Sequence, residues 1–341
     1  MIVSVVIPTY CRSALLCEAI ESVLGQNIDR LELLVIDDGS TDDTRERVRR
    51  FGDKVRYIFQ ENQGLGTARN LGFSLAKGKY VALLDDDDWW MPRKLEIQIA
   101  LLENLPDTCG VFTNFSVFRS PEEIISDGIR TWFDPNINLS TYLGSPLKLR
   151  DILDHRFGYE PDTDVYVSPI YDQSLEQYFV LPSTSLIRRS SIPADLEFPK
   201  HDPICGDWEF FARLSRDSSL CFLDADTTFN RSHNDSHRLT RTKMISQIEL
   251  RIDFLERVYL ADNEYYSANR TKVDKTHLAR LTELCKLQIL ASDLAAARET
   301  AAKARLLDVA KTPKQLLVLS AAAFPGADRA ARQLRKLKRM L

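Results

Sequence analysis

The chain has 341 residues, of which 44% are hydrophobic and 28% charged, and its formal net charge is −4. This composition is typical of a soluble globular protein with one large domain or two, and the lack of a basic excess argues against nucleic acid as a partner. The six cysteines form no CxxC pair and the five histidines show no zinc spacing, so neither a disulfide framework nor a zinc site is expected. No apolar run approaches the roughly 18 residues of a membrane helix, and the first residues do not resemble a signal peptide.

The first 118 residues alternate between two kinds of pattern. Runs rich in β-branched apolar residues predict buried strands at residues 2–8, 31–36, 55–59, 80–84 and 109–118. Helical periodicity predicts helices at residues 13–26, 41–51, 66–76 and 92–105, with Ser13 placed to cap the first. Strands and helices that alternate at this spacing form βαβ units, so we expect an α/β fold with a mainly parallel sheet.

The rest of the chain is less regular. Loops with short elements are expected from residue 119 to about 180, followed by a strand at 179–188, a helix at 206–215 and a short strand at 220–222. Helices rich in Ala and Leu are expected at 245–260, 277–304 and 315–324, and an amphipathic one at 327–341. We therefore expect one domain at residues 1–240, with halves 1–118 and 119–240, and a helical region at 241–341.

Polar side chains follow three of the predicted strands where each strand ends. The first strand runs into Pro8, Thr9 and Tyr10, the second into DDGS at 37–40, and the fourth into four consecutive aspartates at 85–88. Ligands of a parallel α/β sheet bind beyond the carboxyl ends of its strands, so we expect these side chains to face one crevice. Each cluster also has a structural explanation, because DDGS is a common turn and an acid run is usually a solvated loop.

Four neighbouring carboxylates repel one another unless a cation lies close to them. Alternate acids of the run are expected to point to the same side, and two carboxylates on one side are hard oxygen ligands suited to Mg²⁺ or Mn²⁺. Such an ion would remove the repulsion and can bridge the phosphates of a nucleotide. The pattern therefore favours a divalent-metal site over a solvated loop.

In their order along the chain, the motifs resemble those of inverting glycosyltransferases of family 2. The resemblance rests on VSVVIPTYCR, LLVIDDGSTDDT, NQGLGTARNLGFSLAKGKYVALLDDDDWWMPRKL, GDWEFFARL and RSHNDS, which together cover roughly residues 1 to 236. It implies a GT-A fold, which is a Rossmann-like, mainly parallel sheet flanked by helices, here with a C-terminal helical extension. Residues 1–118 would then be the nucleotide-binding half and residues 119–240 the acceptor-side half.

The resemblance implies donor-binding roles at the first two strand ends. Pro8, Thr9 and Tyr10 would pack on the nucleoside of the donor. Asp38 would accept a hydrogen bond from the nucleobase, which favours uracil or thymine. Arg69, in TARN, would lie where a cation can approach the donor, and an exposed helix residue is the alternative reading.

The acid run matches the DxD signature of the family. Asp87 would bind the metal, Asp85 would reach the ribose or the ion through water, and Asp88 would contact the sugar or support the site. Asp86 lies between the two signature acids and counts with the donor-binding residues. The tandem acids leave open whether Asp85 or Asp86 pairs with Asp87 at the metal.

Asp207, in GDWEFF, matches the catalytic base of the family. Direct displacement at an anomeric carbon needs a base that removes the proton of the acceptor hydroxyl as it attacks. Many relatives have Glu-Asp where this chain has Gly206-Asp207, which leaves the acceptor contacts open. The structural alternative for Asp207 is a helix N-cap.

His233, in RSHNDS, matches a histidine that some relatives use to bind the metal from a loop. A neutral imidazole can complete an oxygen-rich Mn²⁺ site, and an ordinary surface histidine is the alternative. Arg231 or Arg238 could clamp the donor diphosphate from the same segment.

These roles predict a metal-dependent inverting glycosyltransferase with Mn²⁺ or Mg²⁺ as cofactor. Its donor would be a nucleoside diphosphate sugar, with UDP favoured, and its acceptor a hydroxyl of a glycan or lipid-linked oligosaccharide in surface polysaccharide synthesis. One alternative is a sugar-nucleotide nucleotidyltransferase, which needs a glycine-rich basic loop where this chain has PTYCRSALL. Another is a non-catalytic nucleotide-sugar-binding module, against which the retained acids argue. The sugar, the linkage and the oligomeric state stay open.

The last predicted helix bears on location. Ala330, Leu334, Leu337 and Leu341 line one face of residues 327–341, and Arg and Lys occupy most of the rest. A basic amphipathic helix suits anionic lipid headgroups. It would hold a cytoplasmic protein on the inner face of the membrane, and a solvated or subunit-docking helix is the alternative.

Overall fold

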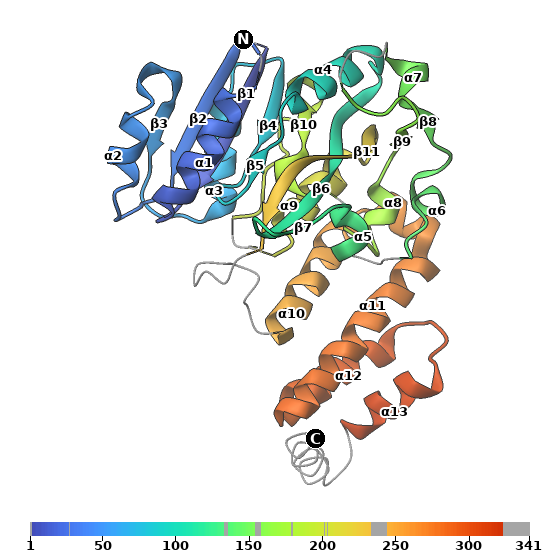
Figure 1. Ribbon diagram of the computed structural model, residues 1–341. Helices are drawn as coiled ribbons and strands as arrows, with labels where there is room; N and C mark the ends of the chain where they lie inside the picture. The colour runs from blue at the N-terminus through green and yellow to red at the C-terminus, as the bar shows by residue number, and fades with distance from the viewer. Residues whose placement is uncertain are drawn as a thin grey trace. The chain divides into compact units, whose positions relative to one another are not determined.

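The computed structural model (Figure 1) describes residues 2–26, 28–132, 136–153, 158–178, 180–200, 202, 204–232 and 244–322. The chain divides into two compact units, Met1–Ser236 and His237–Leu341, each with a hydrophobic core of its own. Within the described ranges, none of the helices combines the length and the apolar character needed to cross a membrane.

One mixed sheet forms the centre of the first unit. Its strands are β1 (Val3–Thr9), β2 (Leu31–Asp37), β3 (Arg56–Phe59), β4 (Tyr80–Leu83), β5 (Trp89–Trp90), β6 (Thr108–Ser120), β7 (Glu123–Ile125), β8 (Leu147–Lys148), β9 (Asp164–Ser168), β10 (Leu186–Arg188) and β11 (Ser219–Arg231). They lie in the order β3-β2-β1-β4-β10-β6-β11-β9-β8, with β5 beside β11 and β7 beside β6. β1 pairs in parallel with β2 and β4, and β6 with β11, whereas β10 runs antiparallel between β4 and β6. The predicted α/β fold with a mainly parallel sheet is confirmed.

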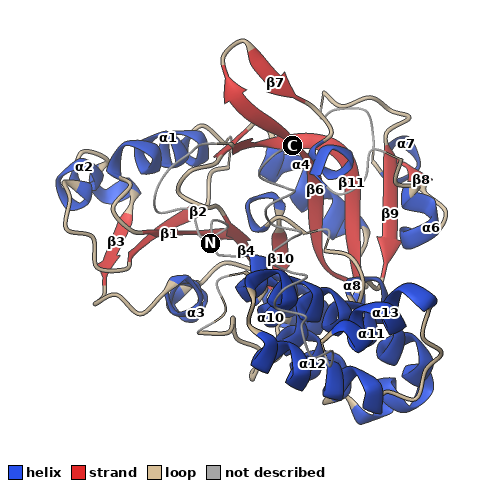
Figure 2. Cartoon of the chain, turned by 90° about the horizontal axis from the view of Figure 1, so that it is seen from below, coloured by secondary structure: helices blue, strands red, loops and turns tan. Residues whose placement is uncertain are grey.

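Helices cover both faces of this sheet. They are α1 (Ser13–Leu24), α2 (Thr44–Arg49), α3 (Leu65–Leu75), α4 (Lys94–Asn104), α5 (Gly128–Trp132), α6 (Leu139–Leu143), α7 (Leu149–Ile152), α8 (Tyr171–Ser174) and α9 (Gly206–Leu214), with 3₁₀ turns η1 (Gly52–Lys54), η2 (Pro182–Thr184) and η3 (Arg189–Ser191). Because side chains alternate along a strand, Val5 and Ile7 of β1 pack with α1 and α4, whereas Val6 packs with α3 and α9. Figure 2 shows α1 and α3 on opposite sides of β1 and β2.

The packing of α3 on β1 is unusually close, and a glycine permits it. A Cβ atom on Gly72 would lie 2.2 Å from Cγ1 of Val6, so a larger residue would push the helix away from the strand. The same helix carries Arg69. The close contact therefore helps to fix the position from which Arg69 reaches the end of the sheet.

The start of α1 differs from the prediction. The helix begins at Ser13 itself, Arg12 occupies the N-cap position, and no side chain caps the helix there. The Ser13 hydroxyl donates instead to Asp43 Oδ1 (2.5 Å), and the Ser13 N–H donates to Asp42 Oδ2 (3.3 Å). The prediction that Ser13 caps α1 was therefore wrong, because the acids before α2 compete for its hydroxyl.

Residues 119–232 depart furthest from the predicted elements. The short strand expected at 220–222 is only the start of β11, which has 13 residues and shifts register at Leu223/Asp226 and Asp226/Phe229. The strand expected at 179–188 is reduced to β10, with the turn η2 before it. Bulges of this kind break the alternation of apolar and polar residues, so the sequence pattern did not predict most of β11.

The second unit is helical. It contains α10 (Met244–Leu255), the π-helix η5 (Glu256–Leu260), α11 (Asn263–Ala291), α12 (Leu294–Leu306) and α13 (Pro313–Ala321). Ala297, Ala301 and Ala304 of α12 belong to one core cluster with Leu281 and Cys285 of α11, as expected for an Ala-rich helical hairpin. α11 begins at Asn263, well before the predicted start at residue 277. The basic segment at 327–341 lies outside the described residues.

Candidate active site

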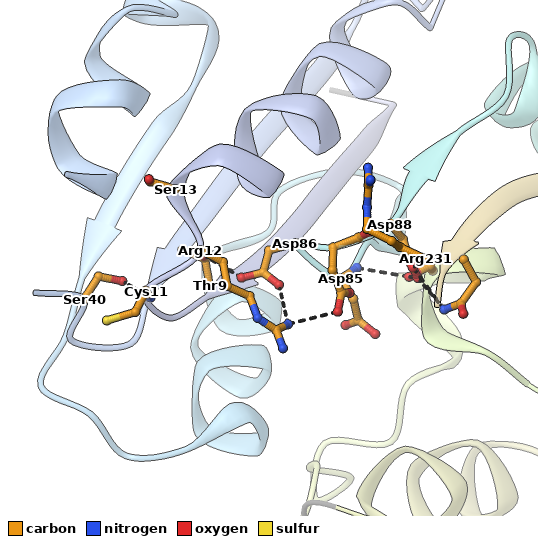
Figure 3. Close-up of polar contacts among 12 residues, drawn as sticks. Thr9, Cys11, Arg12, Ser13, Ser40, Asp85, Asp86, Asp88 and Arg231 are labelled. Atoms are coloured by element: carbon orange, nitrogen blue, oxygen red, sulfur yellow. Dashed lines mark hydrogen bonds and ion pairs between the residues drawn. The ribbon is translucent and has the colours of Figure 1, made fainter. Parts of the chain in front are cut away.

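Three strand ends meet at one edge of the sheet. β1 lies between β2 and β4 in the strand order, and Thr9 at the end of β1 is in register with Asp37 at the end of β2. The acid run begins just after β4, and the Thr9 hydroxyl donates to Asp86 Oδ2 (2.7 Å). The structure therefore brings the polar segments at residues 8–10, 37–40 and 85–88 together (Figure 3).

The four consecutive aspartates alternate in exposure. The side chains of Asp85 and Asp87, here called the outer pair, are 26% and 18% exposed. Asp86 and Asp88, the inner pair, are only 5% and 1% exposed. A hydrogen bond from the Asp88 N–H to the Asp85 carbonyl (3.1 Å) bends the run into a turn. The outer pair thus keeps carboxylate surface for a ligand, whereas the inner pair is enclosed by protein.

Asp88 is held by donors from two distant segments. Its Oδ1 accepts hydrogen bonds from the Arg231 N–H (3.1 Å) and Asn230 Nδ2 (3.0 Å), and its Oδ2 accepts one from Ser183 Oγ (2.6 Å). Burial, and then the charges of the outer pair, raise the pKa of Asp88 well above its usual range. Asp88 therefore supports the turn of the acid run, and its contact with a sugar stays a prediction.

Asp86 is tied to the first strand and to the loop after it. Besides the Thr9 bond, its Oδ1 accepts from Arg12 Nη1 at 3.0 Å, and the same nitrogen lies 3.0 Å from Asp87 Oδ2 (Figure 3). Burial, and then the charge of Asp87, raise the pKa of Asp86 to about 7, against the lowering effect of Arg12. One guanidinium group thus neutralises an inner and an outer acid together.

Arg69 links the acid run to the second part of the site. It is 3% exposed, its Nη2 donates to Asp85 Oδ1 (2.8 Å), and its guanidinium carbon lies 5.3 Å from the centre of the Phe198 ring. Burial alone would lower the pKa of Arg69, but the charges of Asp85 and Asp207 raise it overall. Arg69 is therefore a buried cation, and the alternative of an exposed helix residue is wrong.

Asp207 is the second residue of α9, whose N-cap is Cys205, so the alternative of an N-cap is wrong as well. Its Oδ1 accepts from the Trp208 N–H (2.8 Å). Burial raises the pKa of Asp207 to about 6, with Arg69 lowering and Asp85 raising it. Burial and then the charge of Asp207 raise the pKa of Tyr178 well above its usual range. The predicted base therefore shares the cation Arg69 with the acid run.

Asp38 organises the loop that follows β3. Its Oδ1 accepts from Gln60 Nε2 (2.6 Å) and the Gln63 N–H (2.9 Å), and its Oδ2 accepts from the Gly64 N–H (2.8 Å). Gly39 beside it has φ +87°, and a Cβ there would lie 2.8 Å from the Asn62 nitrogen. The carboxylate is therefore preorganised by internal donors at the strand edge.

The remaining donor-side residues differ in exposure. Pro8 and Thr9 are buried at the end of β1, whereas Tyr10 is 40% exposed. An exposed aromatic ring beyond a strand end is suited to stacking on a flat ligand. Of the three, Tyr10 therefore offers the largest surface for a nucleobase.

Arg231 lies at the end of β11, and its guanidinium group contacts other residues of the same chain. Its Nη2 donates to Glu18 Oε2 (2.5 Å), its Nε donates to the Asp87 carbonyl (3.2 Å), and its guanidinium carbon lies 4.5 Å from the centre of the Trp89 ring. It thus ties α1 to the acid run, a role that the sequence did not suggest. His233 and Arg238 lie outside the described residues.

Three residues of the site were not predicted. Arg12 appeared in the sequence only as part of PTYCR, although a cation next to a strand end was a usable signal for a partner of the acids. Ser183 and Asn230 contact Asp88 across sequence separations of 95 and 142 residues. Neither has a sequence signal, because both depend on how η2 and β11 pack in three dimensions.

The described residues contain no group of three His, Cys, Asp or Glu side chains arranged to hold a metal ion. The donor chemistry of the outer pair nevertheless suits a hard dication, because both are carboxylates with exposed surface. Asp85 and Asp87 fit such an ion as two of its ligands, and the remaining ligands would come from elsewhere.

Residues 4–153 match the family described as glycosyl transferase family 2. An uncharacterized glycosyltransferase of Rickettsia prowazekii is 41% identical over 104 residues, which cover 30% of this chain and 33% of the relative. The UDP-Glc:alpha-D-GlcNAc-diphosphoundecaprenol beta-1,3-glucosyltransferase WfaP of Escherichia coli is 31% identical over 144 residues, which cover 42% of this chain and 55% of the relative. The matched segment thus spans between a third and about half of the length of these relatives.

Solved structures with the same fold extend over nearly the whole chain. TarS (residues 1–349) of S. aureus in complex with UDP-GlcNAc aligns with 98% of this chain and 92% of its own length, with a TM-score of 0.57 and 16% identity. The mannosyltransferase PcManGT of Pyrobaculum calidifontis in complex with GDP-Man and Mn²⁺ aligns with 97% and 83%, with a TM-score of 0.53 and 16% identity. At such identities the likeness concerns the fold.

The family match and the relatives that share its segment identify residues 4–153 as a glycosyl transferase family 2 segment.

Proposed function

We propose that the chain is a metal-dependent inverting glycosyltransferase. It transfers a sugar from a UDP-sugar to a hydroxyl of a glycan or lipid-linked oligosaccharide in surface polysaccharide synthesis. The observation that carries this proposal is the position of Arg69, which pairs with Asp85 of the acid run and stabilises the charge of Asp207. Arg69 thereby links the acid run, which would hold the donor phosphates, to Asp207, which would act as the base. Such an arrangement suits a transfer reaction.

The nucleoside end of the donor is assigned to the edge formed by β1 and β2. Tyr10 offers an exposed ring for the base. Asp38 stays our candidate acceptor for the imide N–H of uracil, and to reach it the base has to approach a carboxylate that is 5% exposed and already accepts three internal hydrogen bonds. The names of WfaP and of the TarS complex, which specify UDP-Glc and UDP-GlcNAc, support UDP as the carrier.

The metal site is assigned to the outer pair, with Asp87 as ligand and Asp85 as its partner. The greater exposure of Asp85 favours it over Asp86, whose carboxylate is enclosed by Thr9 and Arg12. When bound, Mn²⁺ or Mg²⁺ would neutralise charge on the departing diphosphate. His233, outside the described residues, stays our candidate for a further ligand, and the PcManGT complex with Mn²⁺ supports dication use by this fold.

Asp207 is assigned as the general base. A pKa of about 6 leaves it mostly ionised at neutral pH while keeping it basic enough to accept a proton. It takes the proton of the acceptor hydroxyl as the hydroxyl oxygen bonds to the anomeric carbon. The bond from that carbon to the phosphate oxygen breaks in the same step and leaves the nucleoside diphosphate. One displacement converts an α-linked donor to a β-linked product.

The proposal is tested with a panel of UDP-sugars, with GDP-mannose as comparison, in the presence of Mn²⁺ or of EDTA. We expect UDP release with one UDP-sugar only when metal is present, and a β-linked product by proton NMR when a glycan acceptor with free hydroxyls is added. A parallel assay supplies UTP and a sugar 1-phosphate, and pyrophosphate release from that pair would indicate a nucleotidyltransferase instead. Binding of a UDP-sugar without release under any condition would indicate a binding module. Either result would overturn the proposal.

The acceptor and the location are assigned from the basic segment at 327–341, which lies outside the described residues. We propose that it contacts anionic lipids on the inner face of the membrane, where a lipid-linked acceptor would be available. Co-sedimentation with vesicles that contain phosphatidylglycerol tests this. A chain that ends at residue 326 should lose the binding and keep turnover of a water-soluble acceptor.

A further inference from the structure

Arg12 lies between two carboxylates of the acid run. Its Nη1 is 3.0 Å from Asp86 Oδ1 and 3.0 Å from Asp87 Oδ2, and its side chain is only 14% exposed. Figure 3 shows the Arg12 side chain directed toward Asp86. One nitrogen thus bridges an inner and an outer acid at equal distance. This is the kind of position, between neighbouring carboxylate oxygens, that a cation takes when it offsets their repulsion.

The loop that carries Arg12 is anchored on both sides. Cys11 has the left-handed φ of 52°, and its N–H donates to Ser40 Oγ (2.8 Å), which holds the loop against the end of β2. The next residue after Arg12 starts α1. The backbone is therefore anchored on both sides of Arg12.

Asp87 is also the acid that we assign to the metal. An ion bound by Asp87 and an Arg12 guanidinium bonded to Asp87 Oδ2 would place two positive groups around one carboxylate. Two positive groups bonded to the same carboxylate repel each other, so the metal ion and the Arg12 guanidinium compete for Asp87. Asp86, whose Oδ1 also accepts from Arg12, offers the guanidinium a buried anion to which it stays bonded.

We propose that Arg12 is the resident counter-ion of the acid run. In the metal-free protein it holds Asp86 and Asp87 together in place of a dication, and it releases Asp87 when the dication binds. Arg12 therefore stabilises the empty site and lowers its affinity for metal. The inference rests on the metal site of the proposed function and adds Arg12 as a competitor of the metal ion for Asp87.

A purely structural role for Arg12 makes the opposite prediction for metal. If Arg12 only kept the acid run in shape, its removal would destabilise the protein and weaken metal binding together. A resident counter-ion gives effects of opposite sign, because its removal destabilises the empty site and frees Asp87 for the ion. The two readouts together separate these roles.

The test uses the full chain, freed of metal with a chelator, and the variants Arg12→Gln and Arg12→Lys. Mn²⁺ alone is titrated and followed by the electron paramagnetic resonance signal of the free ion, and thermal unfolding is recorded without metal. The control is Arg47→Gln, since Arg47 makes a comparable ion pair with Asp43 (2.8 Å) on the surface of α2. Arg12→Lys keeps the positive charge. If Arg12→Gln folds poorly, Mn²⁺ affinity and thermal unfolding can still be compared between Arg12→Lys and the wild type.

We expect Arg12→Gln to unfold at a lower temperature without metal and to bind Mn²⁺ about tenfold more tightly, a factor that corresponds to about 1.4 kcal/mol. Arg12→Lys should fall between it and the wild type, because its ammonium keeps the charge but is more strongly hydrated and sits on a more flexible stem. Arg47→Gln should resemble the wild type in both measurements.

Equal or weaker Mn²⁺ binding by both Arg12 variants would overturn the inference. If the wild type binds Mn²⁺ and transfers sugar while the variants match its affinity, the inference alone fails. If neither the wild type nor any variant binds Mn²⁺, the inference fails together with the metal site of the proposed function.

Discussion

Two groups of aspartates in the first unit can be compared. The first acidic cluster is Asp85–Asp88, at the end of β4. The second acidic cluster is Asp127, Asp224 and Asp226, beside the register shifts of β11. Each contains an arginine: Arg12 bridges two acids of the first cluster, and Arg130 bonds Asp127 (2.7 Å) and Asp224 (3.2 Å) of the second. An arginine that bonds two of the acids therefore does not distinguish them.

The neutral partners do distinguish them. In the second cluster, Asn114 Nδ2 donates to both Asp127 Oδ1 and Asp224 Oδ1 (2.9 Å each), and Ser116 Oγ donates to Asp226 Oδ2 (2.6 Å). Each of its acids is thus fixed by an uncharged group of β6. In the first cluster, Thr9 and Ser183 donate to the inner pair, whereas Arg12 and Arg69 bond the outer pair.

The comparison indicates what an acidic cluster needs in order to bind a ligand. Carboxylates saturated by neutral donors cannot gain much from an incoming ion, since its binding would break those bonds. Carboxylates neutralised by arginine can exchange one cation for another. By this criterion the first cluster suits ligand binding and the second cluster suits support of the irregular part of β11.

The largest contrast is expected between Asp207→Asn and Asp226→Asn. Both remove a partly buried acid whose pKa is raised by loss of solvent, but only Asp207 is assigned to proton transfer. Asp207→Asn should lower kcat by about 10²- to 10⁴-fold, the usual contribution of a general base. Asp226→Asn should leave kcat within about threefold of the wild type, consistent with a site outside the chemistry. Initial rates of UDP release measure both, and equal losses in the two variants would erase the contrast.

The next contrast compares Asp87→Ala with Asp224→Ala in their response to ligand. UDP with Mn²⁺ at about a hundred times its Kd should stabilise the wild type by about 2.7 kcal/mol through mass action. Asp87→Ala should lose this gain, because the ion would lack its main ligand. Asp224→Ala should start from a lower melting temperature and keep the full gain. Thermal unfolding with and without ligand checks this, and a retained response in Asp87→Ala would contradict the metal assignment.

A smaller effect is expected when a serine that supports each cluster is removed. Ser183→Ala leaves Asp88 Oδ2 without its serine donor and the Asp85 N–H without its acceptor, and should lower the free energy of unfolding by about 1–3 kcal/mol. Ser116→Ala should cost a similar amount through Asp226. Only Ser183→Ala should also weaken Mn²⁺ binding, because it loosens the turn of the acid run. Urea unfolding and Mn²⁺ titration measure both, and the same metal affinity in both variants would go against the comparison.

The smallest effect concerns pH. Because burial raises the pKa of Asp207 to about 6, its protonated form appears at a higher pH than in an ordinary aspartate. kcat/KM should therefore fall about tenfold for each pH unit below about 6. The folded chain binds this proton more tightly than the unfolded chain, so ionised Asp207 destabilises the fold above that pH. Asp207→Asn should accordingly be no less stable than the wild type at pH 8. A flat rate profile down to pH 5 would count against Asp207 as base.

Much of the fold could be predicted because local patterns determine it. β1 and β2 are runs of apolar residues, most of which are buried. α1 and α3 each carry a regular apolar stripe. β11 could not be predicted in full, because its register shifts occur within the polar stretch DADTT. The pairing of Trp89 and Trp90 with β11 depends on contacts more than a hundred residues apart and has no local signature.

The candidate site was predictable to a similar extent. The sequence indicated that residues 8–10, 37–40 and 85–88 belong together, because strand ends of one sheet meet at one edge, and the family resemblance added Asp207. It could not indicate which aspartates are enclosed, since that depends on Ser183 and Asn230. Nor could it reveal that Arg69 contacts Asp85 and lies near Asp207, because a buried arginine and an exposed one look alike in a helix.

The most direct measurement is a calorimetric titration of UDP, with and without Mn²⁺, into the wild type, Asp87→Ala and Asp207→Asn, with transfer rates recorded on the same preparations. The wild type and Asp207→Asn should bind UDP equally well when Mn²⁺ is present, although only the wild type transfers sugar. Asp87→Ala should do neither. Wild-type binding by Asp87→Ala, or transfer at the wild-type rate by Asp207→Asn, would contradict the division of labour between the two carboxylates.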